Sequence, residues 1–297
     1  MQEIILSNKY LSLGILPDLG ASLSFLRYHK GAQPVDILRP FETDKVKPDS
    51  NNTALFPMLP YCGRIRGGSF TYWGILRKVP RTHTAFQDPI HGDGWKKQWQ
   101  VLEQSPSHVT LGLTHDKKDN GFPFSYSAKL TYKIADGNLS VEMSVHNPSP
   151  LPMPCGLGIH PFFVREKDVE LNFKSQVVWS NESDPIFDEP YTTPTAWNFD
   201  GGKPLKNAVF DTCFGGFEEQ ARIVYPSKDI TVDVTTSDLF HHVVLFAPKG
   251  KNFFSLEPSS NASNAFNLAA DGVIGTGIRS IGPNQSISGN ITFKIQG

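Results

Sequence analysis

The sequence has no long apolar run and no excess of charge of either sign. No stretch approaches the roughly 18 consecutive apolar residues that a membrane-spanning helix needs. Residues 1–6 have neither the basic region nor the apolar core of a signal peptide. The 28 Lys and Arg residues almost balance the 29 Asp and Glu residues, so the chain has no general attraction for nucleic acid or anionic membranes. We therefore expect a cytoplasmic protein that binds neither.

Cysteine is scarce as well. The chain has Cys62, Cys155 and Cys213, and an odd number at wide spacing fits reduced thiols better than a disulfide framework. Their spacing does not match a zinc-binding set either. We predict that all three are small buried hydrophobic residues, a role that free cysteine often takes.

Sustained helical periodicity is missing, whereas alternation of apolar and polar residues recurs along most of the chain. This alternation indicates half-buried strands, and the 25 glycines and 23 prolines suit the many turns between them. A chain of 297 residues could form two ordinary domains or one large all-β domain. Because strand patterns are alike throughout, we predict a single all-β domain over residues 1–297, antiparallel and sandwich-like, with little helix.

The clearest strand pair covers residues 125–134 and 139–146, where apolar side chains alternate with polar ones. Asp136 and Gly137 lie between them, and Asp-Gly is typical of two-residue hairpin turns. Similar pairs are predicted at residues 98–102 with 109–113, at 230–235 with 243–246, and within 286–295. The polar stretches 41–52 and 179–206 are predicted to be solvated loops, the second too long to be an idle connection.

Two ionisable residues stand directly before a proline at the end of an apolar strand pattern. His160 follows an alternating run over residues 155–159, and Glu257 follows a similar run over residues 253–256. Because proline biases the preceding residue towards extended backbone, we predict that each side chain is held rigidly at a strand end. A half-buried carboxylate is costly unless it has partners or a task. The pair therefore indicates an acid and a base for proton transfer, and a structural histidine with a structural glutamate is the alternative.

Three further stretches place polar residues beside glycine or aromatic residues. Arg64 could donate hydrogen bonds to a ligand, or it could be a solvated surface charge. His91 offers a hydrogen-bonding group close to the aromatic face of Trp95, although a turn with a structural tryptophan is the alternative. His91 and Asp93 are too few ligands for a metal site. Asp211, flanked by aromatic residues, could orient sugar hydroxyls or cap a turn.

These motifs occur in an order that resembles the aldose 1-epimerase (galactose mutarotase-like) family over nearly the whole chain. The matching pieces are Arg64-Ile65-x-x-Gly68-x-Phe70, His91-Gly92, His160-Pro161-Phe162-Phe163, Asp211-x-Cys213-Phe214 and Leu256-Glu257-Pro258. The resemblance implies a large twisted β-sandwich with an open sugar-binding cleft and no cofactor.

The resemblance also implies roles for single residues. Glu257 matches the family's general base and His160 its general acid, while His91, Arg64 and Asp211 match its sugar-orienting positions. We add Trp95 to the predicted sugar-binding residues for its aromatic face.

The chain departs from the best-known branch of the family in three places. It has Gly63 where that branch has Asn before the arginine, Asp93 where that branch has the second glycine of His-Gly-Gly, and two phenylalanines after Pro161. These departures leave the acid and base intact and the preferred sugar open.

The sequence therefore predicts a mutarotase that interconverts the anomers of a free aldohexose such as glucose or galactose. We expect a monomer or homodimer whose ligand is a small sugar, and we expect neither a metal nor a nucleotide to be needed. One alternative is a mutarotase of hexose 6-phosphates, for which Arg66, Arg77 and Lys78 are the nearest cationic candidates. A non-catalytic sugar-binding or sensing protein is the second, and a glycosidase fits least because it would use two carboxylates.

Overall fold

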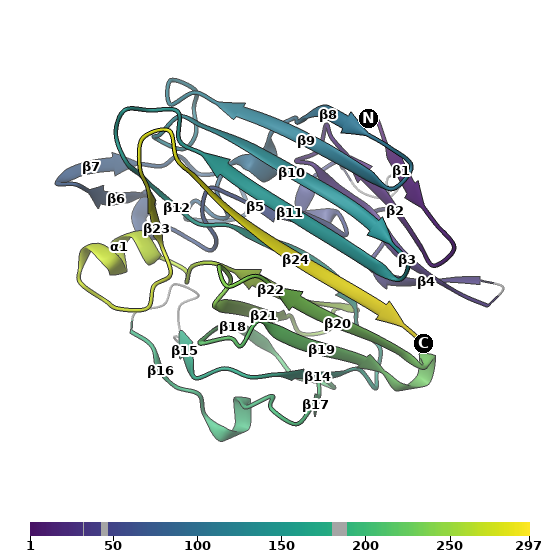
Figure 1. The fold of residues 1–297 in the computed structure, drawn as a ribbon. Coiled ribbons are helices and arrows are strands. Elements are labelled where there is room, and N and C mark those ends of the chain that lie inside the picture. The colour runs from purple at the N-terminus through teal and green to yellow at the C-terminus, as the bar shows by residue number, and fades with distance from the viewer. Residues whose placement is uncertain (32, 43–46, 180–188) are drawn as a thin grey trace.

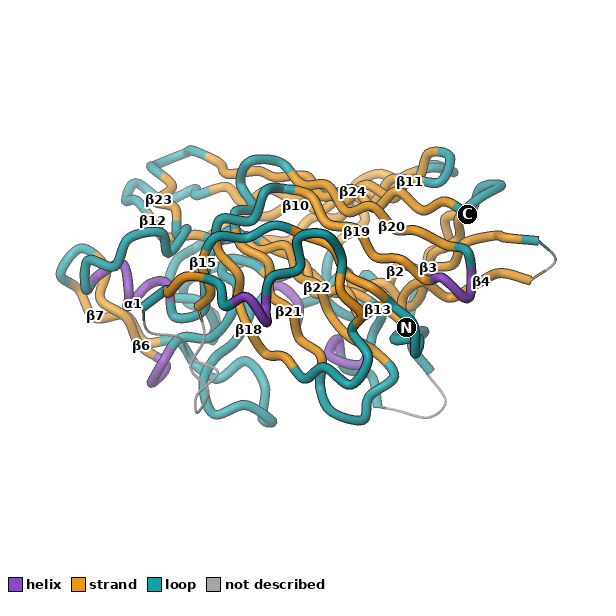
Figure 2. The backbone as a smooth tube through the Cα atoms, turned by 90° about the horizontal axis from the view of Figure 1, so that it is seen from below, coloured by secondary structure: helices purple, strands orange, loops and turns teal. Residues whose placement is uncertain are grey.

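The protein is built from two large antiparallel β-sheets that pack face to face (Figure 1). The computed structural model describes residues 1–297 except residue 32, residues 43–46 and residues 180–188. In Figure 2, β10 and β24 lie in one layer and β13, β21 and β22 lie in the other. The predicted all-β class with little helix is confirmed.

The first sheet carries the site described below. Among the described residues its strand order is β1 (Ile4–Ser7), β2 (Leu11–Leu16), β3 (Ser22–Lys30), β4 (Gln33–Leu38), β13 (Gly158–Val164), β22 (Phe253–Ser259), β21 (His242–Ala247), β18 (Phe210–Gly215), β15 (Val177–Trp179) and β16 (Tyr191–Thr192). A further strand, β5 (Leu55–Met58), pairs with β13 and β3.

The second sheet covers the back of the first. Its order among the described residues is β17 (Lys203–Pro204), β14 (Glu170–Phe173), β19 (Gln220–Tyr225), β20 (Ile230–Thr236), β24 (Ser286–Gln296), β11 (Asn138–His146), β10 (Tyr126–Ala135), β9 (His108–His115) and β8 (Gln100–Gln104). Two small pairs complete the strands: β6 (Ser69–Tyr72) with β7 (Ile75–Lys78), and β12 (Met153–Cys155) with β23 (Arg279–Ile281).

Outside the undescribed residues, helical structure is limited to short pieces. They are α1 (Ala265–Ala270) and the 3₁₀ turns η1 (Ser50–Asn52), η2 (Arg66–Gly68), η3 (Gly94–Lys96), η4 (Thr195–Trp197) and η5 (Pro226–Lys228). Within the described part of the chain, no helix has the length and apolar character needed to span a membrane.

The hairpin of β10 and β11 forms as the sequence predicts. Ala135 pairs with Asn138, so Asp136 and Gly137 alone make the turn, and Asp136 takes the left-handed backbone that such turns require. The predicted apolar face of β10 is buried, whereas Lys129 is exposed. The 3.6-residue pattern that would have favoured a helix is absent because the buried positions recur at every second residue.

Two other predicted pairings are wrong, although the strands themselves exist. β20 pairs with β19 and β24 in the second sheet, while the strand at 243–246, β21, pairs with β18 and β22 in the first. The connection between β20 and β21 crosses the sandwich and buries Phe240 in the core. Residues 286–295 form one long strand, β24, between β11 and β20 rather than a hairpin.

The core lies between the two sheets and fixes which side chains face outwards. Phe163 of β13 stacks on Phe254 of β22 with ring centroids 5.5 Å apart, and it also contacts Phe293 of β24 in the opposite sheet. Because neighbouring residues in a strand point to opposite faces, Phe162 points out of the core. All three cysteines are free and buried, as the sequence predicts.

The two stretches predicted to be solvated loops are more structured than expected. Ser50 at the end of the stretch 41–52 is buried and donates a hydrogen bond to the backbone carbonyl of Trp95. The stretch 179–206 contributes the short edge strands β16 and β17. Residues 43–46 and 180–188 of these stretches lie outside the described residues.

Residues 129 and 130 test the alternation directly. Leu130 is 0% exposed, so Leu130→Ala should lower the free energy of unfolding by about 2–5 kcal/mol through lost burial and the cavity left behind. Lys129→Ala, on the opposite face of the same strand, should change it by no more than about 0.5 kcal/mol. Urea unfolding of both variants measures the difference, and equal losses would contradict this assignment of faces.

Candidate active site

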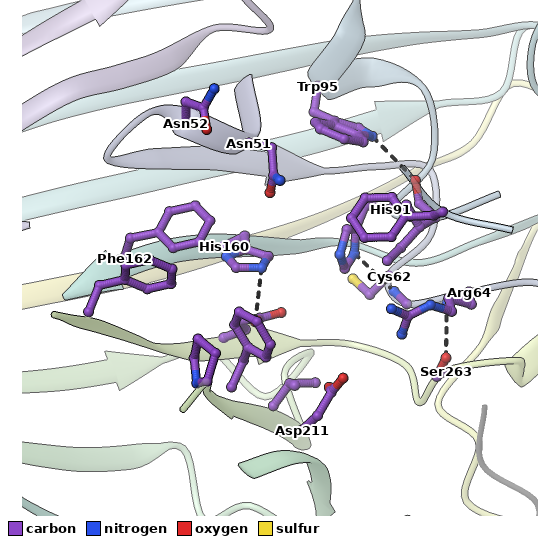
Figure 3. Close-up of a pocket in the computed structure, with 18 of the residues that line it drawn as sticks. Asn51, Asn52, Cys62, Arg64, His91, Trp95, His160, Phe162, Asp211 and Ser263 are labelled. Carbon is purple, nitrogen blue, oxygen red and sulfur yellow. Dashed lines mark hydrogen bonds and ion pairs between the residues drawn. The ribbon is translucent and has the colours of Figure 1, made fainter. Parts of the chain in front are cut away.

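A pocket of about 370 Å³ opens on the face of the first sheet that points away from the core. Strands β13, β22 and β18 supply its floor, and loops after β5 and before η3 supply one wall (Figure 3). The pocket brings together all the residues that the sequence singled out for sugar chemistry: Arg64, His91, Trp95, His160, Asp211 and Glu257.

His160 and Glu257 face each other across two neighbouring strands. β13 and β22 keep one register on both sides of this point, which sets His160 directly opposite Glu257. The ladder between the strands is interrupted at residues 159–161 of β13, where Pro161 and Pro258 have no N–H to donate. Nε2 of His160 lies 3.1 Å from Oε1 of Glu257.

The prediction that the two residues lie at strand ends is wrong. Both prolines lie inside their strands, which continue to Val164 and Ser259. A proline inside a strand is tolerated where no ladder hydrogen bond is required of it. The side chains are therefore held from both directions, more firmly than a strand end would hold them.

Burial opposes charge on both members of this pair. It lowers the pKa of His160 well below its usual value, and the electrostatic influence of the neighbouring His91 and of the Arg39 guanidinium lowers it further. Burial also raises the pKa of Glu257 well above its usual value, and Asp211 adds to that rise while Arg64 opposes it. At a 3.1 Å separation the two groups titrate as one unit. The state that burial favours holds one proton between the carboxyl group and the imidazole.

Neighbouring side chains fix the orientation of the His160 ring. The rings of Phe162 and Phe56 lie 4.4 and 4.6 Å from it, centroid to centroid. Its Nδ1 lies 3.3 Å from Oγ of Ser255. The ring therefore has little freedom to turn away from Glu257.

His91 is held in a tight exchange of hydrogen bonds with Gly63. The backbone N–H of His91 donates to the carbonyl of Gly63 at 2.8 Å, and the N–H of Gly63 donates to Nδ1 of His91 at 3.2 Å. Because Nδ1 accepts, the ring proton of the neutral imidazole is on Nε2. Burial, helped by the charge of Arg64, lowers the pKa of His91 to about 3. His91 is thus a neutral hydrogen-bond donor at ordinary pH.

Gly63 itself has no room for a side chain. Its φ is +69°, and a Cβ atom there would lie 2.7 Å from Cα of Ser263. Ser263 also accepts the N–H of Arg64 on its Oγ at 2.9 Å. The segment around Ser263 therefore packs directly against the backbone that carries Arg64.

Arg64 is the cation whose charge acts on the pocket's carboxyl groups. Its guanidinium carbon lies 5.7 Å from the centre of the Phe86 ring. Partial desolvation raises the pKa of Asp211, and Arg64 opposes that rise as it does for Glu257. Figure 3 places Arg64 and Asp211 on the same side of His160.

The structure places Trp95 behind the pocket wall. The indole borders the pocket but is 0% exposed, and Phe56 stacks on it with ring centroids 4.9 Å apart. Its N–H already donates to the carbonyls of Ile90 and Gly92, at 3.3 and 3.1 Å. The aromatic face expected to meet a sugar therefore supports Phe56 instead.

Asp93, one of the departures from the best-known branch, belongs to a buried network below the pocket. Its carboxylate accepts a 2.5 Å hydrogen bond from the hydroxyl of Tyr126 and lies 3.4 Å from Nδ1 of His115. It also accepts the backbone N–H of Phe122 at 3.3 Å. This residue anchors the loop of His91 to β9 and β10.

Sequence analysis missed several residues that line the pocket. Asn51 and Asn52 come from the stretch expected to be solvated, and Arg39 and Lys251 add two cations. Nothing in the local sequence distinguishes these from surface residues. The cations that sequence analysis named for a phosphate, Arg66, Arg77 and Lys78, are not among the residues that line it.

Three of the pocket residues could hold a metal ion. Possible ligand atoms of His91, His160 and Glu257 all lie within 4.8 Å of one another. This set is larger than the pair His91 and Asp93, which sequence analysis judged too small for a metal site. Metal-independent activity stays a prediction, which dialysis against a chelator would test.

Comparison with known proteins points to one family. A family model described as aldose 1-epimerase matches residues 2–293. The uncharacterized protein YphB of Escherichia coli K12 is 23% identical over 268 residues, which cover 88% of this chain and 89% of YphB. An aldose 1-epimerase of the same organism is 28% identical over 99 residues, or 31% of this chain and 28% of that enzyme.

Solved structures share the fold. A galactose mutarotase-like protein from Clostridium acetobutylicum superposes with a TM-score of 0.86 at 21% identity, covering 99% of this chain and 95% of the other. A GalM/aldose epimerase homologue from C. elegans gives a TM-score of 0.84 at 18% identity, covering 99% and 98%.

Burial of neutral His91 predicts a pH-dependent stability. Its pKa is about 3 in the folded chain, against 6.5 when exposed, so below 6.5 the unfolded chain binds a proton that the folded chain refuses. The stabilisation from this site is complete above pH 6.5 and decreases by about 1.4 kcal/mol per pH unit as the pH falls towards 3. His91→Gln should lack this decrease.

Urea unfolding at several pH values measures the effect. The difference in the free energy of unfolding between the parent protein and His91→Gln should become smaller as the pH falls below 6.5. The control His241→Gln changes a side chain that is 50% exposed, and its curve should run parallel to that of the parent. Parallel curves for His91→Gln as well would show that the buried imidazole does not control this stability.

Proposed function

The chain belongs to the aldose 1-epimerase family, and on that premise we propose that it interconverts the α and β anomers of a cyclic aldohexose. Glucose and galactose are the simplest such substrates. The contact that carries the proposal is the one between His160 and Glu257, 3.1 Å apart and buried in the floor of the pocket. We further propose that the enzyme works in the cytoplasm, and the three free cysteines suit a reducing compartment.

The proposed reaction needs one base and one acid at the same carbon. A carboxylate at Glu257 takes the proton from the anomeric hydroxyl while the imidazolium of His160 protonates the ring oxygen, so the ring opens to the aldehyde. The aldehyde group then rotates about the bond that joins its carbon to the next carbon of the chain. The reverse proton transfers close the ring again and give the other anomer. The proton count of the protein is the same before and after.

The shared proton of the pair supplies this chemistry. The uncharged state, with the carboxyl proton of Glu257 facing Nε2 of His160, has the same number of protons as the carboxylate–imidazolium state that ring opening requires. A shift of one proton over 3.1 Å converts one state into the other. A polar sugar in the pocket would stabilise the charged state, because hydrogen bonds from the sugar to the two charged groups offset the cost of burying them.

The other pocket residues are proposed to position the sugar. His91 offers its Nε2–H as a neutral donor towards the ring oxygen, because its Nδ1 is occupied by the N–H of Gly63. Arg64 and Asp211 offer a donor and an acceptor for hydroxyl groups.

A non-catalytic sugar-binding protein is the second candidate. It would need the hydrogen-bonding residues but not a proton held between two buried groups. An NMR exchange assay of anomer interconversion decides between them, since a binding protein would leave the spontaneous exchange rate unchanged.

The acid and the base can be removed one at a time. Glu257→Gln and His160→Gln should each lower kcat by about 100-fold or more, the range usual for positioned acid and base groups. Because the two residues act as a unit, the double variant should be little worse than the poorer single one. Polarimetry of freshly dissolved sugar gives the rates.

The control is Glu142→Gln, an exposed glutamate of β11, which should keep the parent activity. Circular dichroism should show that every variant is folded. Full activity in folded Glu257→Gln would rule out this mechanism.

The pH profile should report the shared proton. Loss of that proton gives the alkaline limb of kcat/KM, and the raised pKa of Glu257 moves this limb above the usual carboxyl range. Gain of a second proton gives the acidic limb, which the lowered pKa of His160 moves below the usual imidazole range. The expected profile is bell-shaped, and its two limbs belong to the pair. A profile with no alkaline limb would show that no acid is required.

A further inference from the structure

The end of the pocket away from Arg64 carries positive charge, and none of the described residues that line this end is an acid. Arg39 and Lys251, which we call the basic end, both line the pocket, and Lys251 is two residues before Phe253, over whose ring Arg39 lies. Arg39 lies against Phe162 and donates to the carbonyl of Asn51. Figure 3 shows Phe162 on the side of His160 opposite to Arg64. The acid–base pair therefore lies between two cationic ends.

Arg39 is fixed in place. Its guanidinium carbon lies 3.6 Å from the ring centre of Phe162 and 4.3 Å from that of Phe253. Its Nε donates to the carbonyl of Thr53 at 3.2 Å, and Nη2 donates to Asn51. Within the described residues, these bonds leave the Nη1 amino group without a hydrogen-bond partner. A stacked guanidinium with a free amino group is a preorganised donor for an oxyanion.

The carboxyl groups of the pocket do not neutralise this end. Arg64 is the cation whose charge acts on both Asp211 and Glu257. Burial lowers the pKa of Arg39 to about 10, and among the described residues no carboxyl group offsets that effect. Arg39 is still charged at neutral pH, and a partly buried charge without a counter-ion is costly unless a ligand supplies one.

The basic end lies within reach of a substituent on a sugar whose anomeric carbon is at the acid–base pair. The Phe162 ring centre is 3.6 Å from the guanidinium carbon of Arg39 and 4.4 Å from the His160 ring centre. The guanidinium is thus no more than 8.0 Å from the imidazole, a span that a pyranose with an exocyclic group can bridge.

We propose that Arg39 and Lys251 bind an anionic group on the exocyclic carbon of the sugar, so that the preferred substrate is an aldose bearing a phosphate ester, a sulfonate or a carboxylate there. This inference rests on the proposed mutarotase function, because it uses the same pocket. The three groups share an oxyanion that a guanidinium and an ammonium recognise. Comparing sugars that carry each of these groups distinguishes the phosphate ester, the sulfonate and the carboxylate.

The test compares glucose with glucose 6-phosphate, with its 6-sulfonate analogue and with glucuronate. NMR exchange gives kcat/KM for anomer interconversion of each sugar. At least one anionic sugar should exceed glucose by about tenfold or more, the effect of one charge-assisted hydrogen bond. Added salt should reduce that advantage, because it screens the ionic contact. The anion that gains most identifies the natural group.

Variants connect the advantage to the basic end. Arg39→Met should lower kcat/KM for the favoured anionic sugar about tenfold more than for glucose, and Lys251→Met should do so to a smaller extent because Lys251 is exposed. Arg39→Lys should recover part of the loss. The control is Lys249→Met. Lys249 is an exposed lysine of the same turn, but it does not line the pocket, so its loss should leave the rates for both sugars as they are in the parent.

Two outcomes would overturn the inference. Either glucose is as good a substrate as every anionic sugar, or Arg39→Met lowers the rates for neutral and anionic sugars equally, which would make Arg39 structural. If no sugar is turned over, the proposed function fails, and calorimetric titration with the same sugars decides the inference separately. Binding of an anionic sugar that Arg39→Met weakens would support it, and binding that Arg39→Met does not change would contradict it.

Discussion

The contact between His160 and Glu257 is the constraint around which the first sheet is organised. Two strands in constant register are interrupted where both carry a proline, so the two side chains meet across a gap in the ladder rather than above a complete one. Phe56 and Phe162 close around the imidazole. Their rings remove water from the pair, and this dehydration makes a shared proton more stable than two separate charges.

Much of the fold could be predicted from side-chain alternation, because burial of every second residue is a property of one strand. The hairpin at Asp136-Gly137 was predictable for a second reason, since its turn is encoded locally. The partners of β20 and β21 were not predictable in this way. Alternation is the same whichever sheet a strand joins, and the choice depends on a crossing segment that buries Phe240.

The pocket residues also differ in whether local sequence is enough to predict them. His160, Glu257, His91, Arg64 and Asp211 belong to short motifs that sequence analysis could recognise, and the fold brings them into one pocket. Arg39 and Lys251 could not be predicted to join them, because each looks like a surface cation in a turn and only the path of the chain brings it to the pocket. Trp95 shows the reverse: its motif was recognised, but its indole faces inwards.

The packing around Gly63 restricts which residue can occupy this position. The best-known branch of the family has an asparagine at this position, yet here a Cβ atom would lie 2.7 Å from Cα of Ser263, on a backbone with φ of +69°. Replacing Gly63 by asparagine alone therefore does not fit the backbone as it lies here. The segment around Ser263 would have to move away first, and with it the hydroxyl that accepts the N–H of Arg64. The two forms of the pocket are therefore separated by a coupled pair of changes, because the residue at position 63 and the path of the segment around Ser263 have to change together.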